Sequence, residues 1–186
     1  MSQPAAVRKF PLSYHEYVLF PKDRNRREIL EGELFVTPSP KFLHQKVSYR
    51  LSLSLGNHIE RYRLGTLLTA LMDVVLSPHN IVQPDLLFIA KGREKIITND
   101  NIQGAPDLII EIISPSSGSE DRIHKHQVYA RYGVRHYWMI DPDNRLFEAY
   151  QLRGRHYRLV GRYSAVDTFK PSLFPGLSLH LAELWN

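Results

Sequence analysis

A short apolar segment in the second half of the chain constrains its fold most. Residues 106–113 read Pro-Asp-Leu-Ile-Ile-Glu-Ile-Ile. Isoleucines on consecutive positions predict a β-strand that is buried on both faces, as in the interior of a sheet. Residues 114–118 then break the strand, and residues 120–132 predict a helix, with Ser117 and Glu120 at the spacing of a capping box. A helix that follows such a strand favours a crossover to a parallel neighbour.

The remaining elements complete a mixed pattern of helices and strands. Residues 41–64 predict one long helix, because apolar residues recur at about every fourth position, and Gly65 is expected as its C-cap. Other expected elements are a short helix at 13–20, a hairpin or bulged strand at 28–36, and strands at 66–76, 82–90, 107–113, 136–141, 145–150, 157–163 and 177–181. The order from residue 41 is α-β-β-β-α-β, followed by extra hairpin strands. We therefore expect an α/β or α+β fold whose mixed central sheet has helices against its faces.

Length and composition limit the classes of protein to which this chain can belong. A chain of 186 residues favours one domain over residues 1–186. The absence of cysteine excludes disulfides, zinc–thiolate sites and a cysteine nucleophile. Because the sequence shows neither a long apolar run nor the apolar region of a secretory signal, we expect a cytoplasmic protein without a membrane span.

The charge balance permits a nucleic-acid partner without requiring one. The 24 lysines and arginines exceed the 19 aspartates and glutamates, for a formal net charge of +5. The most basic stretch, residues 22–27, reads Lys-Asp-Arg-Asn-Arg-Arg. Such a run is expected to be a solvated loop rather than a nucleic-acid contact.

Acidic residues within apolar strands are the strongest sign of a functional site. Asp85 lies in the strand expected at 82–90, and Asp107 and Glu111 lie in the strand at 107–113. A buried carboxylate is costly without a partner, and Mg²⁺ binds one or two carboxylates together with waters and phosphate oxygens. Each Pro-Asp pair is also compatible with a turn in which the aspartate bonds the backbone. Glu111, between leucine and isoleucine neighbours, favours a functional site.

Strand geometry limits which of these acids can share one ion. Asp107 and Glu111 face the same side of a strand but lie roughly 13 Å apart, too far to bind one metal together. If Asp85 on a neighbouring antiparallel strand faces Glu111, the pair is about 5 Å apart and can share a metal. Asp107 would then lie beside Ile89, away from the site. The sequence leaves this register open.

Three further residues are weaker candidates. Lys125 on the helix after Glu111 is either a site residue or a surface lysine paired with Asp121 at i, i+4. Glu33 is compatible with a solvated strand or turn, and His44, in the first turn of the long helix, with a surface histidine. The motifs G-x-S-x-G, G-x-x-x-x-G-K-[ST], G-x-G-x-x-G and H-E-x-x-H are absent from the sequence.

Several segments together resemble a known family. They are Glu31-Gly32-Glu33-Leu34, Pro40 with His44, Gln83-Pro84-Asp85, residues 104–116, Asp121-Arg122 with Lys125, and residues 129–142, which include Tyr-Trp-x-Ile-Asp-Pro. They resemble the Uma-two family of predicted endonucleases, within the PD-(D/E)XK nuclease superfamily. The resemblance runs from about residue 13 to about residue 177, and it implies a restriction-endonuclease-like αβββαβ core.

The resemblance also implies roles for individual residues. Asp85 and Glu111 correspond to the ligands of Mg²⁺ or Mn²⁺. The superfamily's lysine stands two residues after the second acid, where this chain has Ile113, and Lys125 resembles a displaced replacement. The superfamily also places an acid on its first helix. Because that helix here offers only an acid near its far end, the resemblance leaves Glu33 as the substitute and His44 as a further catalytic candidate.

The implied activity is metal-dependent hydrolysis of DNA phosphodiester bonds. Two alternatives use the same fold without catalysis. One is a module that binds nucleic acid without cutting it, which the departure at Ile113 favours. The other is a dimeric structural module in which the late hairpins and Tyr137-Trp138 form the interface of a homodimer.

Overall fold

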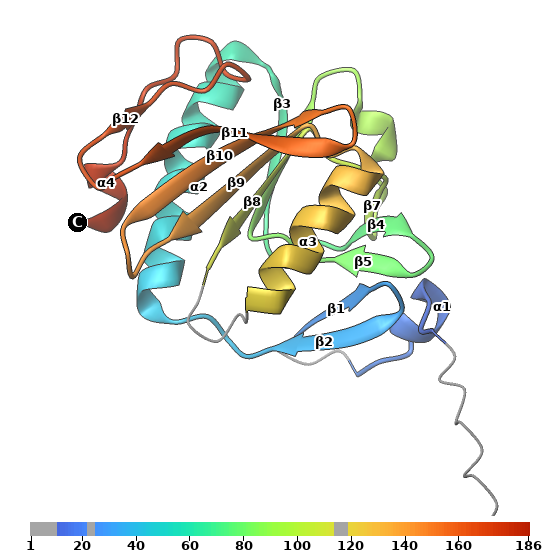
Figure 1. Ribbon diagram of the computed structural model, residues 1–186. Coiled ribbons are helices and arrows are strands. Elements are labelled where there is room, and N and C mark those ends of the chain that lie inside the picture. Colours follow the sequence, from blue (N-terminus) through green and yellow to red (C-terminus); the bar gives the residue numbers. More distant parts are fainter. Residues whose placement is uncertain (1–10, 22–24, 114–118) are drawn as a thin grey trace, which may run out of the picture.

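Two large β-sheets, a short two-stranded sheet and two long helices build most of the part of the chain that the structure describes (Figure 1). In this computed structural model the described residues are 11–21, 25–113 and 119–186. The helices are α1 (Tyr14–Tyr17), α2 (Phe42–Tyr62), α3 (Ser119–Tyr132) and α4 (Ala182–Trp185), with a 3₁₀ turn η1 (Glu94–Ile96). None of these helices is long and apolar enough to cross a membrane.

The larger sheet has six strands and confirms the expected mixed topology. Its order is β11 (His156–Tyr163), β10 (Leu146–Arg153), β9 (His136–Asp141), β8 (Leu108–Ile112), β6 (Leu86–Ala90) and β3 (Gly65–Thr69). Strands β3, β6 and β8 are antiparallel neighbours, and so are β9, β10 and β11. Among the described strands of this sheet, the parallel pair is β8 with β9, and α3 connects the two strands, as the pattern of a buried strand followed by a helix predicts.

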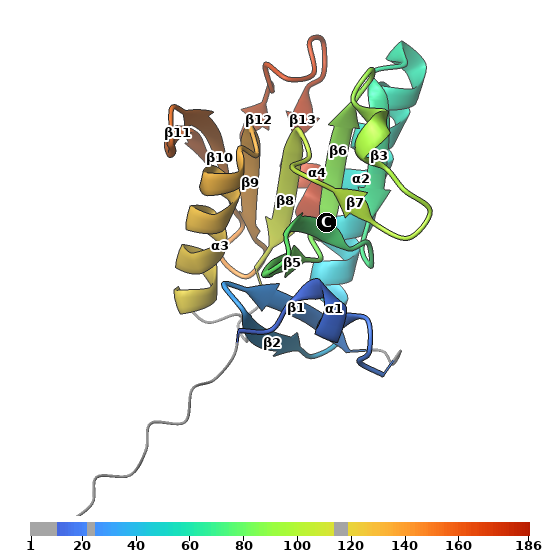
Figure 2. The same ribbon diagram turned by 90° about the vertical axis from the view of Figure 1, so that its right-hand side faces the viewer.

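Helices cover both faces of this sheet (Figure 2). On one face, α2 packs Val47, Leu51, Leu55 and Ile59 into a core with the β-strands and the C-terminal segment. On the other face, α3 packs Val128 and Tyr129 against a second core. Residues that alternate along β8 therefore enter different cores, which explains why the whole strand is buried.

The smaller sheet differs from the single central sheet that the sequence predicts. Its order is β2 (Glu33–Thr37), β1 (Arg26–Leu30), β5 (Asn80–Val82), β4 (Val74–Ser77) and β7 (Ile102–Gln103). The strands expected at 66–76 and 82–90 each divide between the two sheets. Pro84, which has no N–H to donate to a sheet, stands between β5 and β6. This division brings the hairpin β1–β2 beneath one end of the larger sheet, as Figure 2 shows.

Two local expectations are wrong for identifiable reasons. The C-cap of α2 is Arg63, whose φ of 50° is left-handed, and not Gly65. Gly65 instead begins β3, where a Cβ atom would lie 2.1 Å from the carbonyl oxygen of Ile89. The expectation of a solvated loop for the basic run at residues 22–27 is also wrong at its end, because Arg26 and Arg27 belong to strand β1. Its residues 22–24, and the break with its Ser117 cap at 114–118, lie outside the described residues.

The aromatic pair expected at a dimer interface is part of the interior. Tyr137 and Trp138 are each about 1% exposed and lie in β9, in the second and first core respectively. Their neighbours are rings of the same chain, such as Tyr129 for Tyr137 and Phe169 for Trp138. These two residues therefore stabilise the fold and are not available to a partner. The short C-terminal strands β12 (Thr168–Phe169) and β13 (Leu179–His180) pair with each other beyond the sheet.

Candidate active site

The register between β6 and β8 makes Asp85 and Glu111 cross-strand neighbours. The ladder pairs Phe88 with Leu108 and Leu86 with Ile110, and the next positions along it are Asp85 and Glu111. The backbone N–H of Ile112 donates to Oδ2 of Asp85 over 2.7 Å, which holds this carboxylate against β8. Both acids are buried. The register that the sequence left open is therefore the one that lets these two carboxylates meet.

A third buried carboxylate comes from the hairpin of the smaller sheet. Glu28 lies in β1 and is about 1% exposed. Its Oε1 accepts a hydrogen bond from the backbone N–H of Gln83 over 2.8 Å. Because Gln83 lies in the link between β5 and β6, this bond connects the two sheets beside Asp85.

One guanidinium joins the three acids. Arg26 lies two residues before Glu28 in β1, so both side chains project from the same face of the strand. Its Nη1 lies 3.0 Å from Oδ1 of Asp85, and its Nη2 lies 3.1 Å from Oε2 of Glu111 and 3.3 Å from Oε1 of Glu28. The arginine that the sequence places in a solvated run is therefore at the centre of the candidate site.

Helix α3 supplies two more buried groups. The Nζ atom of Lys125 lies 2.7 Å from Oε2 of Glu28 and 3.3 Å from Oε1 of Glu111. The hydroxyl of Tyr129, one helical turn further on, donates to Oε1 of Glu111 over 2.6 Å. Lys125 is only about 5% exposed, so it is not the surface lysine of the alternative hypothesis. The side chain of Asp121, its suggested surface partner, lies outside the described residues.

His44 reaches the same cluster from α2. It lies in the first turn of the helix, and its Nε2 is 3.3 Å from Oδ2 of Asp85. Its other ring nitrogen, Nδ1, is buried and has no hydrogen-bond partner in the described part of the chain. The site therefore combines residues from both sheets and both long helices.

Burial and the two cations affect the three carboxylates differently. Burial raises the pKa of each, but the charges of Arg26 and Lys125 hold the pKa of Glu28 below its ordinary value. His44 and Arg26 likewise lower the pKa of Asp85. For Glu111, burial outweighs the two cations and its pKa is raised. Carboxyl groups with pKa values shifted in opposite directions are typical of sites that handle protons.

The structure excludes two candidate acids from this cluster. Glu33, the substitute for the superfamily's helix acid, is exposed at the start of β2, where it pairs with Leu30. Glu28, on the neighbouring strand, is the acid that reaches the cluster. Asp107 lies just before the other end of β8. Its Oδ1 is 2.6 Å from Nη1 of Arg93, and its Oδ2 accepts a hydrogen bond from the backbone N–H of Ala90 over 2.8 Å. Its role is to fasten the loop after β6, as the turn hypothesis for Pro-Asp suggests.

Sequence reasoning missed Arg26, Glu28 and Tyr129. The alternation Arg26-x-Glu28-x-Leu30 is a usable signal, because it places two charged groups on the face of a strand that ends in a buried leucine. The charged run before it concealed this pattern. Tyr129 follows Lys125 by four residues, the spacing that places two side chains on one face of a helix.

The donor set suits a small divalent cation in type and charge. Carboxylate oxygens are the ligands that Mg²⁺ prefers, and one or two protein carboxylates are enough when a phosphate supplies the others. Asp85 and Glu111 share the Arg26 guanidinium, so their free oxygens already converge on one cation. Within the described residues, however, no three histidine, aspartate or glutamate side chains are arranged to hold a metal ion. Arg26 lies among the carboxylates in this arrangement.

The order α2-β3-β6-β8-α3-β9 is the αβββαβ core of a restriction-endonuclease-like fold. A crystal structure from Anabaena variabilis, described as "a putative nuclease belonging to DUF820", aligns with a TM-score of 0.78. The alignment covers 94% of this chain and 98% of that one at 20% sequence identity, so the likeness concerns the fold.

The sequence comparison identifies the family. Residues 14–182 match the Uma2 family, described as "Putative restriction endonuclease", and the chain belongs to this family. An uncharacterised protein of Synechocystis sp. is 24% identical over 161 residues, which are 85% of this chain and 84% of that protein. These findings confirm the resemblance drawn from the motifs.

Proposed function

We propose that this protein is a metal-dependent nuclease that hydrolyses phosphodiester bonds in DNA. The observation that carries the proposal is the convergence of Glu28, Asp85 and Glu111 with Lys125 at one end of the larger sheet. Burying three carboxylates in one place is costly, and a binding or catalytic role is the usual reason for such an arrangement. Membership of a family described as restriction endonucleases supports the same reaction class.

In this proposal Asp85 and Glu111 hold Mg²⁺ or Mn²⁺. The bound ion would supply Lewis acidity toward the phosphate and lower the pKa of a water. Glu28 holds the ammonium of Lys125 beside Glu111. In this position the ammonium stabilises the negative charge that develops on the phosphate. His44, whose Nδ1 lacks a partner among the described groups, is the candidate for proton transfer.

The direct test is cleavage of supercoiled plasmid DNA by the purified protein. Wild type should nick or linearise the plasmid when Mg²⁺ or Mn²⁺ is present, and cleavage should stop when EDTA removes the metal ion. Asp85→Asn should be inactive at equal concentration. Duplex and single-stranded oligonucleotides of DNA and RNA, used in the same buffer, identify the preferred substrate. DNA binding without cleavage by wild type would favour the non-catalytic alternative.

A homodimer is part of the proposal, with a different surface from the aromatic pair. Strand β11 is one of the two edge strands of the larger sheet as described, and its Leu159 and Val160 are about half exposed. An edge strand with apolar side chains is suited to pairing with a second copy. Light scattering after gel filtration tests this, and Val160→Lys should convert a dimer that uses this edge into monomers.

A cytoplasmic location also belongs to the proposal, and fluorescence microscopy of a tagged chain tests it.

A further inference from the structure

We propose that the guanidinium of Arg26 occupies the metal position of this site, so that a divalent cation binds by displacing it. This inference rests on the proposed function, because it concerns how the same site gains its metal. In this arrangement Arg26 competes with the metal ion, and the affinity of the site for the ion stays low until the guanidinium moves away.

The oxygens that Arg26 contacts are the ones a metal would need. On Asp85, Oδ2 is engaged by the N–H of Ile112 and by His44. On Glu111, Oε1 is engaged by Lys125 and Tyr129. The second oxygen of each acid faces Arg26, which is its one partner in the described part of the chain. Fixed partners therefore orient both carboxylates and leave one oxygen of each to an exchangeable cation.

The charges of the cluster favour exchange over joint occupancy. Glu28, Asp85 and Glu111 carry three formal negative charges and Lys125 one positive charge, which leaves −2, the match for one divalent cation. With Arg26 in place the sum is only −1. Two cations on the same oxygens also repel each other strongly at such short range. The guanidinium and the metal are therefore expected to exclude one another.

The position of Arg26 allows its side chain to leave without unfolding the sheet. It is the first residue of β1, its backbone pairs with Thr37, and its side chain is 15% exposed. The Nε atom has no hydrogen-bond partner among the described groups, so the guanidinium is held at its outer nitrogens alone. A planar guanidinium also binds phosphate oxygens well, which gives the released group a second partner beside the metal.

Calorimetric titration with Mn²⁺ tests the inference without requiring activity. Arg26→Gln should bind Mn²⁺ about tenfold or more tightly than wild type, because a close competing charge has been removed. Arg26→Lys, which keeps the charge but loses the forked geometry, should fall between them. Arg27→Gln removes one positive charge from the next position of β1, where the side chain bonds the carbonyl of Pro21, and should stay within about twofold of wild type.

Thermal unfolding supplies a second measurement. Without metal, Arg26→Gln should melt below wild type, because three carboxylates lose a counter-ion, and saturating Mn²⁺ should remove most of this difference. If Arg26→Gln does not fold without metal, Arg26→Lys carries the test in both measurements.

The outcomes separate this inference from the proposed function. Equal or weaker Mn²⁺ binding by Arg26→Gln, with wild type binding normally, overturns the inference alone. Failure of every protein to bind Mn²⁺ overturns both the metal site and the exchange. Binding by Arg26→Gln but not by wild type supports both. A crystal structure with Mn²⁺ on Asp85 and the guanidinium still on the same carboxylate would also overturn the inference.

Discussion

The Nζ atom of Lys125 and Oε2 of Glu28 are 2.7 Å apart, although the two residues lie in different layers of the molecule. Lys125 comes from the helix that covers the larger sheet, and Glu28 from the hairpin of the smaller sheet. Both side chains are almost completely buried. Their ion pair fixes the ammonium beside Glu111 and ties the hairpin to the helix. This position of Lys125 agrees with the hypothesis that a lysine from α3 replaces the one missing at Ile113.

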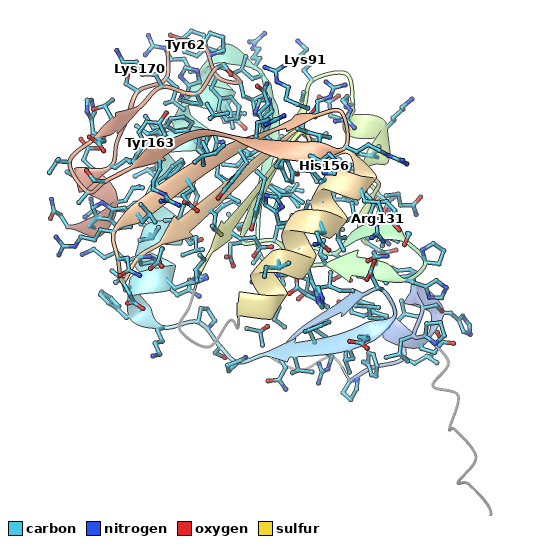
Figure 3. All side chains as sticks on the ribbon, viewed as in Figure 1. Tyr62, Lys91, Arg131, His156, Tyr163 and Lys170 are labelled. Atoms are coloured by element: carbon cyan, nitrogen blue, oxygen red, sulfur yellow. The ribbon has the colours of Figure 1, made fainter. Side chains whose placement is uncertain are left out.

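Replacing Lys125 should damage both catalysis and stability. We expect Lys125→Ala to lower the turnover of DNA cleavage by about 10²-fold or more, as the loss of one preorganised electrostatic contact does. It should also lower the free energy of unfolding by about 3 kcal/mol, because the buried Oε2 of Glu28 loses the ammonium that it contacts. Lys91→Ala is the control, since Lys91 is exposed at the end of the molecule away from β1 and β2 (Figure 3). Full cleavage by Lys125→Ala would remove this residue from the mechanism.

Glu28 and Glu33 provide a matched pair of acids on the same hairpin. Glu28→Gln should reduce cleavage by about tenfold or more, because Lys125 and Arg26 lose a charged partner in the site. Glu33→Gln should cleave like wild type, because this side chain is exposed and pairs across the hairpin with Leu30. Rates of plasmid nicking under single-turnover conditions measure both. If Glu33→Gln loses more cleavage activity than Glu28→Gln, then Glu33 is the site acid, as expected from the sequence.

The two Pro-Asp aspartates should also separate cleanly. Asp85→Asn should abolish Mn²⁺ binding in calorimetry and leave the fold intact, because it removes a negative ligand and keeps the shape. Asp107→Asn should keep metal binding and most of the activity. It should instead lower stability by roughly 1–3 kcal/mol through its weakened contacts with Arg93 and Ala90. Unchanged Mn²⁺ affinity in Asp85→Asn would exclude Asp85 from the metal site.

The opposite pKa shifts of Glu28 and Glu111 predict opposite effects on acid stability. The lowered pKa of Glu28 contributes stability that is present above its ordinary value of 4.5 and is lost as the pH falls below it. The raised pKa of Glu111 works the other way, because the folded protein holds that proton more tightly. Between about pH 6 and 3, the free energy of unfolding should therefore fall less steeply in Glu28→Gln and more steeply in Glu111→Gln than in wild type. Urea titrations at several pH values measure these slopes, and equal slopes in the two variants would contradict the assignment.

Much of the architecture follows from local patterns in the sequence. The buried run at residues 107–113, the long amphipathic helix and the helix after Glu111 each correspond to an observed element. The same periodicity places Asp107 and Glu111 on one face of the strand expected at 107–113, but too far apart to bind one ion. These predictions succeed because the period of a strand or helix depends on near neighbours in the chain. The predictions of single strands at 66–76 and 82–90 are wrong, because each segment forms two strands in different sheets. Only the pairing between strands shows where such a segment passes from one sheet to the other.

The sequence by itself determined the order of elements, the family and the two acids on adjacent strands. The tertiary structure decided which residues join them: Arg26 and Glu28 rather than Glu33, and Lys125 with Tyr129 from α3. The hydrogen bond from Gln83 to Glu28 and the ion pair from Arg26 to Glu111 span 55 and 85 residues of chain. Contacts of this kind depend on how the hairpin and the helix pack against the larger sheet. That packing is a property of whole surfaces, which no short stretch of sequence contains.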